Sequence, residues 1–260
     1  MPTKHILFVT GAFVTTDCWS NWIPYFEAKG YTCAAPSWPG KKASAAQMRA
    51  EHPDKAVAAI RIKDVIDNYA RVAQAMPEPP VIIGHSFGGC MTQVLINRGI
   101  GACGVAIHSV PPQGVLTLAW SFFRSLWGPL GFFTPVDKPF LMSQAQWNYA
   151  FANGQTLAEQ VASYNAITAP ESKRASRDGL TSAVHVDFKK PHAPLLLIGG
   201  STDHIMPASL NRTNFKHYKQ DNGSVTEYKE FAGHNHNVLG IQDWRSVADH
   251  VAGWIATHGG

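Results

Sequence analysis

The sequence predicts an α/β protein with a mostly parallel sheet of about six strands, flanked by helices and interrupted by a helical insertion. Two observations indicate the sheet: strand-like and helix-like segments alternate over residues 1–110, and the alternation resumes over residues 186–260. A third observation, the aromatic density of the stretch between them, indicates the insertion. We therefore expect one domain over residues 1–260, with a helical cap inserted at about 111–185.

The first elements alternate as a parallel sheet requires. Residues 5–10 (HILFVT) form an apolar run that ends at Gly11, which predicts a buried strand. The elements expected after it are a helix at 19–29, a strand at 31–35, a loop at 36–53 and a helix at 56–76.

The remaining elements surround the insertion. Proline and glycine residues separate most of them, and the Asn222-Gly223 turn leads into the last strand. These elements are strands at 81–83, 104–108, 194–199 and 225–231, and helices at 89–98, 208–217 and 243–255.

Gly84-His85-Ser86-Phe87-Gly88 lies between a predicted strand and a predicted helix. A sharp strand-to-helix turn with Ser at its apex is typical of a nucleophile elbow, in which the serine hydroxyl stands above the sheet. The flanking glycines let the strand and the helix pass without Cβ clashes. A chance turn is the alternative for the bare pattern, but the strand before it and the helix after it favour the elbow. Ser86 is thus the candidate nucleophile.

A serine hydroxyl needs a base, and the base needs a partner that orients it. The strand at 194–199 leads to Asp203, and the carboxyl ends of parallel strands meet at one edge of a sheet. Asp203 is therefore the candidate acid, although a turn residue or helix N-cap is the structural alternative.

The last strand leads into Gly233-His234-Asn235-His236, which offers two candidate bases. The short distance to the closing helix favours His236, and the residues alone leave His234 open. A metal site is a further reading of the His-x-His pair, but no third ligand has a matching spacing. We expect no metal.

The insertion carries ten of the 28 aromatic residues of the chain within residues 115–151. Three interpretations compete: a cap whose inner face lines an apolar substrate pocket, plain core, or a membrane-facing surface. Residues 115–136 approach the length of a membrane span, but Arg124, Gly128, Pro129 and Gly131 interrupt them, so we expect no span. If the cap lines the pocket, shortening Trp127 or Phe133 is expected to change the chain-length preference.

Composition narrows the class of partner. The net charge of +4 and the lack of long basic runs argue against nucleic acid. The four scattered cysteines have no metal-ligand spacing. The N-terminal residues do not resemble a secretory signal, so a cytoplasmic location is the expectation. The sequence leaves open whether the protein forms a homodimer.

In these motifs and their order, the chain resembles the α/β-hydrolase superfamily over nearly its whole length. It is similar to a group of single-domain serine hydrolases, largely without assigned substrates, that share stretches like AIHSVPPQG at 106–114 and WNYAFANG at 147–154. In that group the last loop reads Gly-Arg-x-His, so the resemblance identifies His236 as the base. Thr10 departs from the histidine that many superfamily members carry there, which affects the expected shape of the oxyanion loop.

The resemblance implies a catalytic triad of Ser86, Asp203 and His236, an oxyanion hole at the backbone N–H groups of Phe87 and Ala12, and no cofactor. Phe87 also begins the helix, where N–H groups lack intrahelical partners. The expected function is hydrolysis of a carboxylic ester, or a related acyl compound, with a hydrophobic portion. Hydroxynitrile-lyase-type or perhydrolase chemistry, and a non-catalytic ligand receptor, are the alternatives.

Overall fold

The computed structural model, which describes residues 3–41, 44–219 and 221–259, contains a six-stranded sheet in the order β2-β1-β3-β4-β5-β6. All neighbouring strands pair in parallel, which confirms the expectation of a mostly parallel sheet of about six strands. The strands are β1 (His5–Val9), β2 (Thr32–Ala34), β3 (Val81–His85), β4 (Cys103–Ile107), β5 (Leu195–Gly200) and β6 (Thr226–Phe231).

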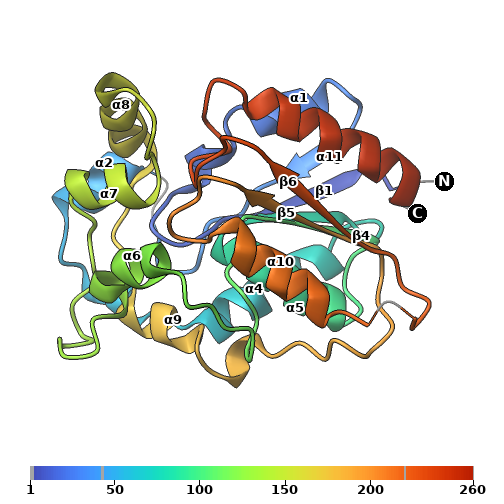
Figure 1. The fold of residues 1–260 in the computed structure, drawn as a ribbon, viewed down its shortest axis with the longest axis horizontal. Coiled ribbons are helices and arrows are strands. Elements are labelled where there is room, and N and C mark those ends of the chain that lie inside the picture. The colour runs from blue at the N-terminus through green and yellow to red at the C-terminus, as the bar shows by residue number, and fades with distance from the viewer. Residues whose placement is uncertain (1–2, 42–43, 220, 260) are drawn as a thin grey trace.

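Helices cover both faces of the sheet, so that its central strands are buried. Every residue of β3 and β4 is buried, as near-continuous apolar sequence in a parallel sheet requires. One face carries α1 (Trp22–Glu27) and α11 (Trp244–His258), and the other carries α4 (Ile62–Gln74), α5 (Phe87–Asn97) and α10 (Ala208–His217) (Figure 1).

The long connection between β4 and β5 gathers at one end of the sheet, opposite the end where both chain termini lie (Figure 1). Because β1 starts near the N-terminus and all strands are parallel, this is the carboxyl end of the strands. We call residues 111–185 the cap. It contains α6 (Trp120–Leu130), α7 (Gln144–Ala150), α8 (Leu157–Ile167), α9 (Lys173–Asp178) and the 3-10 helix η2 (Ser182–Val184).

The expected loop at 36–53 is wrong in part, because it contains α2 (Ala45–Ala50). The Ser44 hydroxyl caps this helix by accepting the N–H of Gln47. Arg49 ties α2 to the cap through main-chain carbonyls of and beyond α8. These carbonyls belong to Tyr164, Asn165 and Thr168.

The helix expected at 56–76 is two helices, α3 (Lys55–Ala59) and α4, separated by two non-helical residues, Ile60 and Arg61. Asp178 of α9 accepts the N–H of Ile62 at 3.0 Å and binds the Arg61 guanidinium through both carboxylate oxygens. This contact joins residues more than 110 positions apart in the sequence, and it determines where α4 begins. The helix expected at 19–29 is present as the shorter α1, and a 3-10 helix, η1 (Thr16–Trp19), precedes it.

Within the described part of the chain, no helix combines the length and the apolar character needed to cross a bilayer.

Candidate active site

Ser86 occupies a strained turn between β3 and α5. Its backbone has φ 59° and ψ −121°, a conformation that non-glycine residues rarely adopt. A Cβ at position 84 would lie 2.1 Å from the carbonyl oxygen of Gly88, and one at position 88 would lie 1.9 Å from that of Val9. Only glycine fits at either position, so the local sequence gives this turn the geometry expected of an elbow.

Asp203 follows β5 and lies fully enclosed beside two imidazoles. Its Oδ1 accepts the N–H groups of Ile205 and Met206 at 2.9 and 2.7 Å. Its Oδ2 accepts from Nδ1 of His236 at 2.6 Å and from Nδ1 of His108 at 2.8 Å. The carboxylate therefore stabilises the turn after β5 and contacts both imidazoles at once.

The charge state of Asp203 follows from these contacts. Burial alone would raise the pKa of its carboxyl, but the charge interaction with His236 and the hydrogen bonds from both imidazoles hold the pKa well below its usual range. Since an ionised carboxylate only accepts hydrogen bonds, His236 and His108 must both carry their proton on Nδ1.

His236 and His234 occupy different environments. His236 is completely buried, and among the described residues its Nε2 has no hydrogen-bond partner. The Nδ1 of His234 bonds the carbonyl oxygen of Ala232, and its Nε2 lies 3.5 Å from the exposed carboxylate of Asp243. Of the two candidate bases, His236 is the one that contacts Asp203.

The third contact of a triad, a hydrogen bond between Ser86 Oγ and His236 Nε2, is not made between these described residues. Such contacts are often long without substrate and shorten in the reacting complex. Ser86 is nevertheless tied to the same strand ends, because its N–H donates to the carbonyl oxygen of Ile107 at 2.9 Å and its carbonyl oxygen accepts from Val110.

His108 is a further site residue; it lies in the shared stretch at 106–114, but no sequence pattern indicated a role for it. It follows β4, which lies between the strand that precedes Ser86 and the strand that precedes Asp203. The strand order therefore places its side chain against Asp203. Burial lowers the pKa of His108 despite the nearby carboxylate, which keeps this imidazole neutral.

His85, directly before Ser86, is a third buried imidazole in the site. Its Nε2 lies 2.9 Å from the carbonyl oxygen of His236, so this nitrogen must be the donor. Burial first, and then the neighbouring His236 and His108, lower the pKa of His85 far below its ordinary value. The unprotonated Nδ1 of His85 has no hydrogen-bond partner in the described part of the chain.

The ligand atoms of His108, Asp203 and His236 lie within 4.8 Å of one another, which raises the question of a metal. Both oxygens of Asp203 already accept two N–H donors each. A zinc ion with bonds of about 2.0–2.2 Å would also hold its ligand atoms farther apart than the 2.6 Å between His236 Nδ1 and Asp203 Oδ2. The arrangement is that of a hydrogen-bonded set and not of a metal centre.

The loop after β1, which carries Ala12, is held by the segment between α8 and α9. The carbonyl oxygen of Phe13 accepts the N–H of Ala169 at 2.8 Å, and the N–H of Thr15 donates to Ile167 at 3.0 Å. Phe13 itself has a positive φ of 67°. The cap thus holds the loop that is expected to provide an oxyanion donor.

Glu171 adds a charged contact to this loop that no sequence pattern indicated. Its Oε2 accepts the N–H of Phe13 at 3.0 Å and the Lys41 ammonium at 2.6 Å, and its Oε1 accepts from Ser172. The side chains of Glu171 and Lys41 are 0% and 3% exposed. This buried ion pair connects the cap, the loop after β2 and the loop after β1.

An apolar cavity of about 60 Å³ opens at Ser86. Its wall includes Ala12 and Phe87, the two predicted oxyanion residues, and apolar side chains from the loops and the cap. These side chains include Phe13, Val110, Phe122, Leu126, Leu130, Ile205 and Met206. A larger cavity of about 420 Å³ shares several of these walls and extends outward along α6.

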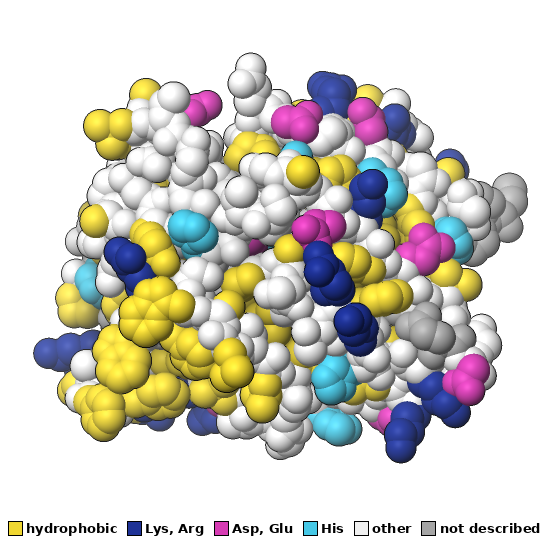
Figure 2. All heavy atoms as spheres, in the orientation of Figure 1, with side chains coloured by type: hydrophobic (Ala, Val, Ile, Leu, Met, Phe, Trp, Pro, Cys, Tyr) yellow, Lys and Arg dark blue, Asp and Glu magenta, His cyan; other side chains and the backbone are white. Residues whose placement is uncertain are grey.

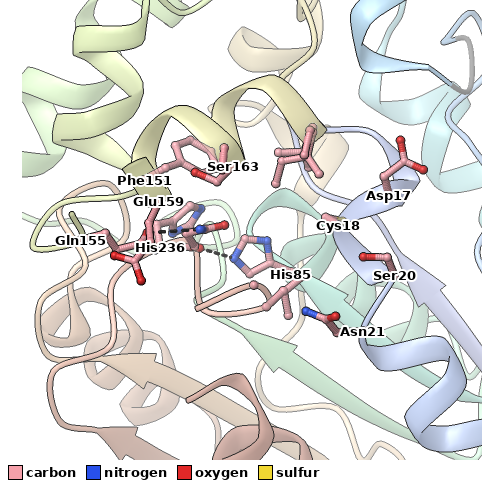
Figure 3. Close-up of a pocket in the computed structure, with 17 residues that line it drawn as sticks. Asp17, Cys18, Ser20, Asn21, His85, Phe151, Gln155, Glu159, Ser163 and His236 are labelled. Atoms are coloured by element: carbon pink, nitrogen blue, oxygen red, sulfur yellow. Dashed lines mark hydrogen bonds between the residues drawn. The ribbon is translucent and has the colours of Figure 1, made fainter. Parts of the chain in front are cut away.

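A third cavity, of about 310 Å³, lies beside the histidines and is more polar (Figure 3). His85 and His236 form part of its wall, joined by the hydrogen bond drawn between them. Phe151 of the cap packs edge-on against His236, with ring centroids 4.6 Å apart. Ser86 lines the apolar cavity and not this one.

The ten aromatic residues of residues 115–151 divide into three groups. Trp147 and Phe151 are buried and stack on each other. Phe122, Phe140 and Tyr149 are half-buried, and Phe122 lines the cavity at Ser86. The other five are exposed: Trp120, Phe123, Trp127, Phe132 and Phe133. Phe133, which the sequence suggested as a pocket residue, is 90% exposed and lines neither cavity that continues from Ser86.

Residues 6–250 match the model of a family described as the alpha/beta hydrolase family. Among solved structures, a monoacylglycerol lipase of Paleococcus ferrophilus is similar with a TM-score of 0.70 and 19% identity, covering 99% of this chain and 96% of that one. Tomato methylketone synthase I, complexed with 2-tridecanone, is similar with a TM-score of 0.71 and 12% identity, covering 99% of this chain and 100% of that one. The methylesterase MES16 of Arabidopsis is similar with a TM-score of 0.67 and 13% identity, covering 97% of this chain and 99% of that one. At these identities the likeness shows the fold alone, and no curated protein sequence matched.

Proposed function

The chain belongs to the alpha/beta hydrolase family, and on that premise we propose that it is a serine hydrolase of carboxylic esters, or related acyl compounds, with a hydrophobic portion. One observation carries the proposal. Ser86, at the apex of a strained turn, faces an apolar cavity, while the buried carboxylate of Asp203 holds the Nδ1 side of His236. In this proposal Ser86 is the nucleophile, His236 its base and Asp203 the residue that orients the base.

The tautomer of His236 sets the direction of proton transfer. Because Nδ1 donates to Asp203, the lone pair of Nε2 is available for the Ser86 proton. Ser86 Oγ attacks the carbonyl carbon as His236 Nε2 takes that proton. The ionised Asp203 then stabilises the positive imidazolium. The hydrogen bond between Ser86 and His236 is expected to form when substrate is bound.

The carbonyl oxygen becomes negatively charged during this attack. The N–H of Phe87 in the first turn of α5 has no intrahelical acceptor, and the N–H of Ala12 is the second proposed donor. One such donor contributes about 10²–10³-fold in rate. The contacts of Glu171 and Ala169 with Phe13 are expected to keep the Ala12 loop in place.

Collapse of the intermediate breaks the bond to the alcohol, which leaves with the proton from His236. The acyl group stays on Ser86 as an ester. His236 then removes a proton from water, and the resulting hydroxide attacks the acyl carbon. The ester bond to Ser86 breaks, the acid leaves, and Ser86 Oγ takes the proton back from His236. Every transfer uses a group of the chain or water, so the proposed reaction requires no cofactor.

The cavity walls favour an acyl chain over a sugar or a phosphate. Phe122, Leu126 and Leu130 of α6 and Met206 of the Asp203 loop are apolar, and the cavity continues outward along α6. Each methylene that enters such a cavity contributes about 0.8 kcal/mol, or about fourfold in kcat/KM.

A panel of p-nitrophenyl esters from acetyl to dodecanoyl tests the proposal directly. The wild type is expected to gain kcat/KM along the series until the chain fills the cavity, and Ser86→Ala is expected to abolish turnover while keeping its thermal stability. Ser209→Ala, an exposed serine on α10 that lines none of these cavities, is the matched control and should behave as the wild type. A Ser86→Ala variant that still hydrolyses the esters would contradict the proposal.

Additional assays separate the alternatives that the sequence left open. Lyase chemistry would release an aldehyde from a cyanohydrin, and perhydrolase chemistry would give a peracid when peroxide is added. A ligand receptor would bind the esters without releasing acid.

A further inference from the structure

Seven large apolar side chains stand exposed on one surface of the cap. We call them the apolar cap surface; their exposed fractions range from 46% to 95%. They are Leu116, Leu118, Trp120, Phe123, Trp127, Phe132 and Phe133. Figure 2 shows hydrophobic side chains gathered in one large patch on this side of the molecule. Monomeric proteins rarely expose a contiguous patch of this kind unless it contacts a partner or a lipid.

The α6 helix has apolar side chains on two sides, and only one of these sides packs against the rest of the protein. Phe122, Leu126 and Leu130 already line the cavity at Ser86, whereas Trp120, Phe123 and Trp127 face outward. A helix that is apolar on both sides needs an apolar environment on both sides. The inner environment is the cavity, and within the described structure the outer one is solvent.

The charges around the patch are mostly positive. Arg124, Lys138, Arg174 and Arg177 are exposed or half-exposed on the cap, against two exposed acids, Asp137 and, on α8, Glu159. The acids of the neighbouring segment are buried and paired, Glu171 with Lys41 and Asp178 with Arg61. Lys and Arg side chains border the patch in Figure 2.

Arg177 belongs to the basic rim, by which we mean the Lys and Arg side chains around the patch, and it contacts the patch directly. Its guanidinium donates to the carbonyl oxygens of Leu130 and Gly131 and lies over the Phe132 ring. An apolar centre with a basic rim is complementary to lipid with anionic headgroups. A symmetric contact with a second copy would instead bring two basic rims together.

The patch also leads to the proposed nucleophile. Leu116, Trp127 and Phe132 of the apolar cap surface line the cavity of about 420 Å³. That cavity shares walls with the one that holds Ser86, at Pro111, Phe122, Leu126, Leu130, Gly179 and Leu180. An apolar chain can therefore pass from the surface toward Ser86 along one continuous apolar lining.

We propose that the apolar cap surface docks on bilayers that contain anionic phospholipid, and that the acyl chain of the substrate enters from there. The entry of the acyl chain rests on the proposed function, whereas the docking on bilayers does not. Trp120, Phe123 and Phe133 insert among the acyl chains, and Arg124, Lys138 and Arg174 contact the headgroups.

Vesicle co-sedimentation tests the docking with the whole chain. Wild-type protein is expected to partition onto vesicles of equimolar phosphatidylcholine and phosphatidylglycerol about tenfold or more better than onto phosphatidylcholine alone. The double variant Trp120→Ser/Phe133→Ser is expected to lose about tenfold or more of this partitioning. Neither residue lines the cavities that continue from Ser86, so hydrolysis of a short, soluble ester should not change.

Leu157→Ser is the matched control, because Leu157 is 68% exposed on α8 and is not part of the apolar cap surface. This variant should bind vesicles as the wild type does. Ser86→Ala should also bind fully, which separates docking from catalysis. If ester hydrolysis fails and vesicle binding holds, only the proposed function is wrong.

Three results would overturn the docking proposal. The wild type could fail to bind the anionic vesicles, or the double variant could bind as well as the wild type. Sedimentation equilibrium could also show a dimer that the double variant dissociates, which would assign the apolar cap surface to a second copy of the chain.

Discussion

Replacement of Glu171 by alanine is expected to lower both stability and kcat, for reasons that can be separated. Glu171 accepts from Lys41 at 2.6 Å and from the N–H of Phe13 at 3.0 Å, in a place closed to solvent. Breaking one partner of a buried ion pair costs about 3–5 kcal/mol, because the other charge remains buried. The free energy of unfolding should fall by about that amount.

The effect on kcat comes from the loop and not from the ion pair itself. Phe13 has a positive φ and directly follows Ala12, the proposed oxyanion donor. If the loop relaxes, the N–H of Ala12 loses its alignment, and one such donor contributes about 10²–10³-fold. We expect kcat to fall by about 10²-fold with KM little changed, since Ala12 would act mainly in the transition state.

The assay is steady-state hydrolysis of p-nitrophenyl butyrate, at a temperature where urea titration shows the variant folded. Asp178→Ala is the matched control, because it breaks another ion pair between the cap and the core, with Arg61, away from the Ala12 loop. That control should lose stability but retain most of its kcat. Equal kcat in the wild type and Glu171→Ala would refute the reasoning and leave Glu171 a purely structural role.

Three other predictions follow from the site. His236→Ala should lower ester turnover by about 10³-fold or more, whereas His234→Ala keeps most of it, and the reverse order would assign the base to His234. Phe122→Ala should shift the relative kcat/KM toward bulkier acyl groups by about tenfold, measured on the ester panel; an unchanged profile would remove this ring from the substrate pocket. Burial lowers the pKa of His85 and of His108, so below about pH 6.5 the unfolded chain takes up protons that the folded chain does not, and stability falls by up to about 1.4 kcal/mol per pH unit for each imidazole. Urea titrations that show constant stability from about pH 7 to about pH 5 would contradict this sign.

The parts of the fold that local chemistry determines could be predicted from the sequence. No other residue type fits at positions 84 and 88, because a Cβ at either position would overlap main-chain atoms. The six-stranded parallel sheet followed from short apolar runs separated by turn residues, and it is confirmed. The proximity of Asp203 to His236 followed from parallel strand ends meeting at one edge.

The parts that depend on distant contacts could not be predicted in this way. The start of α4 is fixed by Asp178, which is 116 residues away from Ile62. The pair of Glu171 and Lys41 joins residues 130 positions apart, and neither lies in a motif.

His108 could have been found from the strand order alone, once β4 was placed between β3 and β5. The outward rings of α6 could not, because a helix with apolar residues on both sides has no periodicity that tells the inner side from the outer.

The central claim is that Ser86 is the nucleophile, and reaction with a fluorophosphonate followed by intact-protein and peptide mass spectrometry tests it most directly. The account predicts one covalent adduct on the peptide that contains Ser86, absent in Ser86→Ala and greatly slowed in His236→Ala. A folded wild-type protein that forms no adduct, or a Ser86→Ala variant labelled as fast as the wild type, would contradict it.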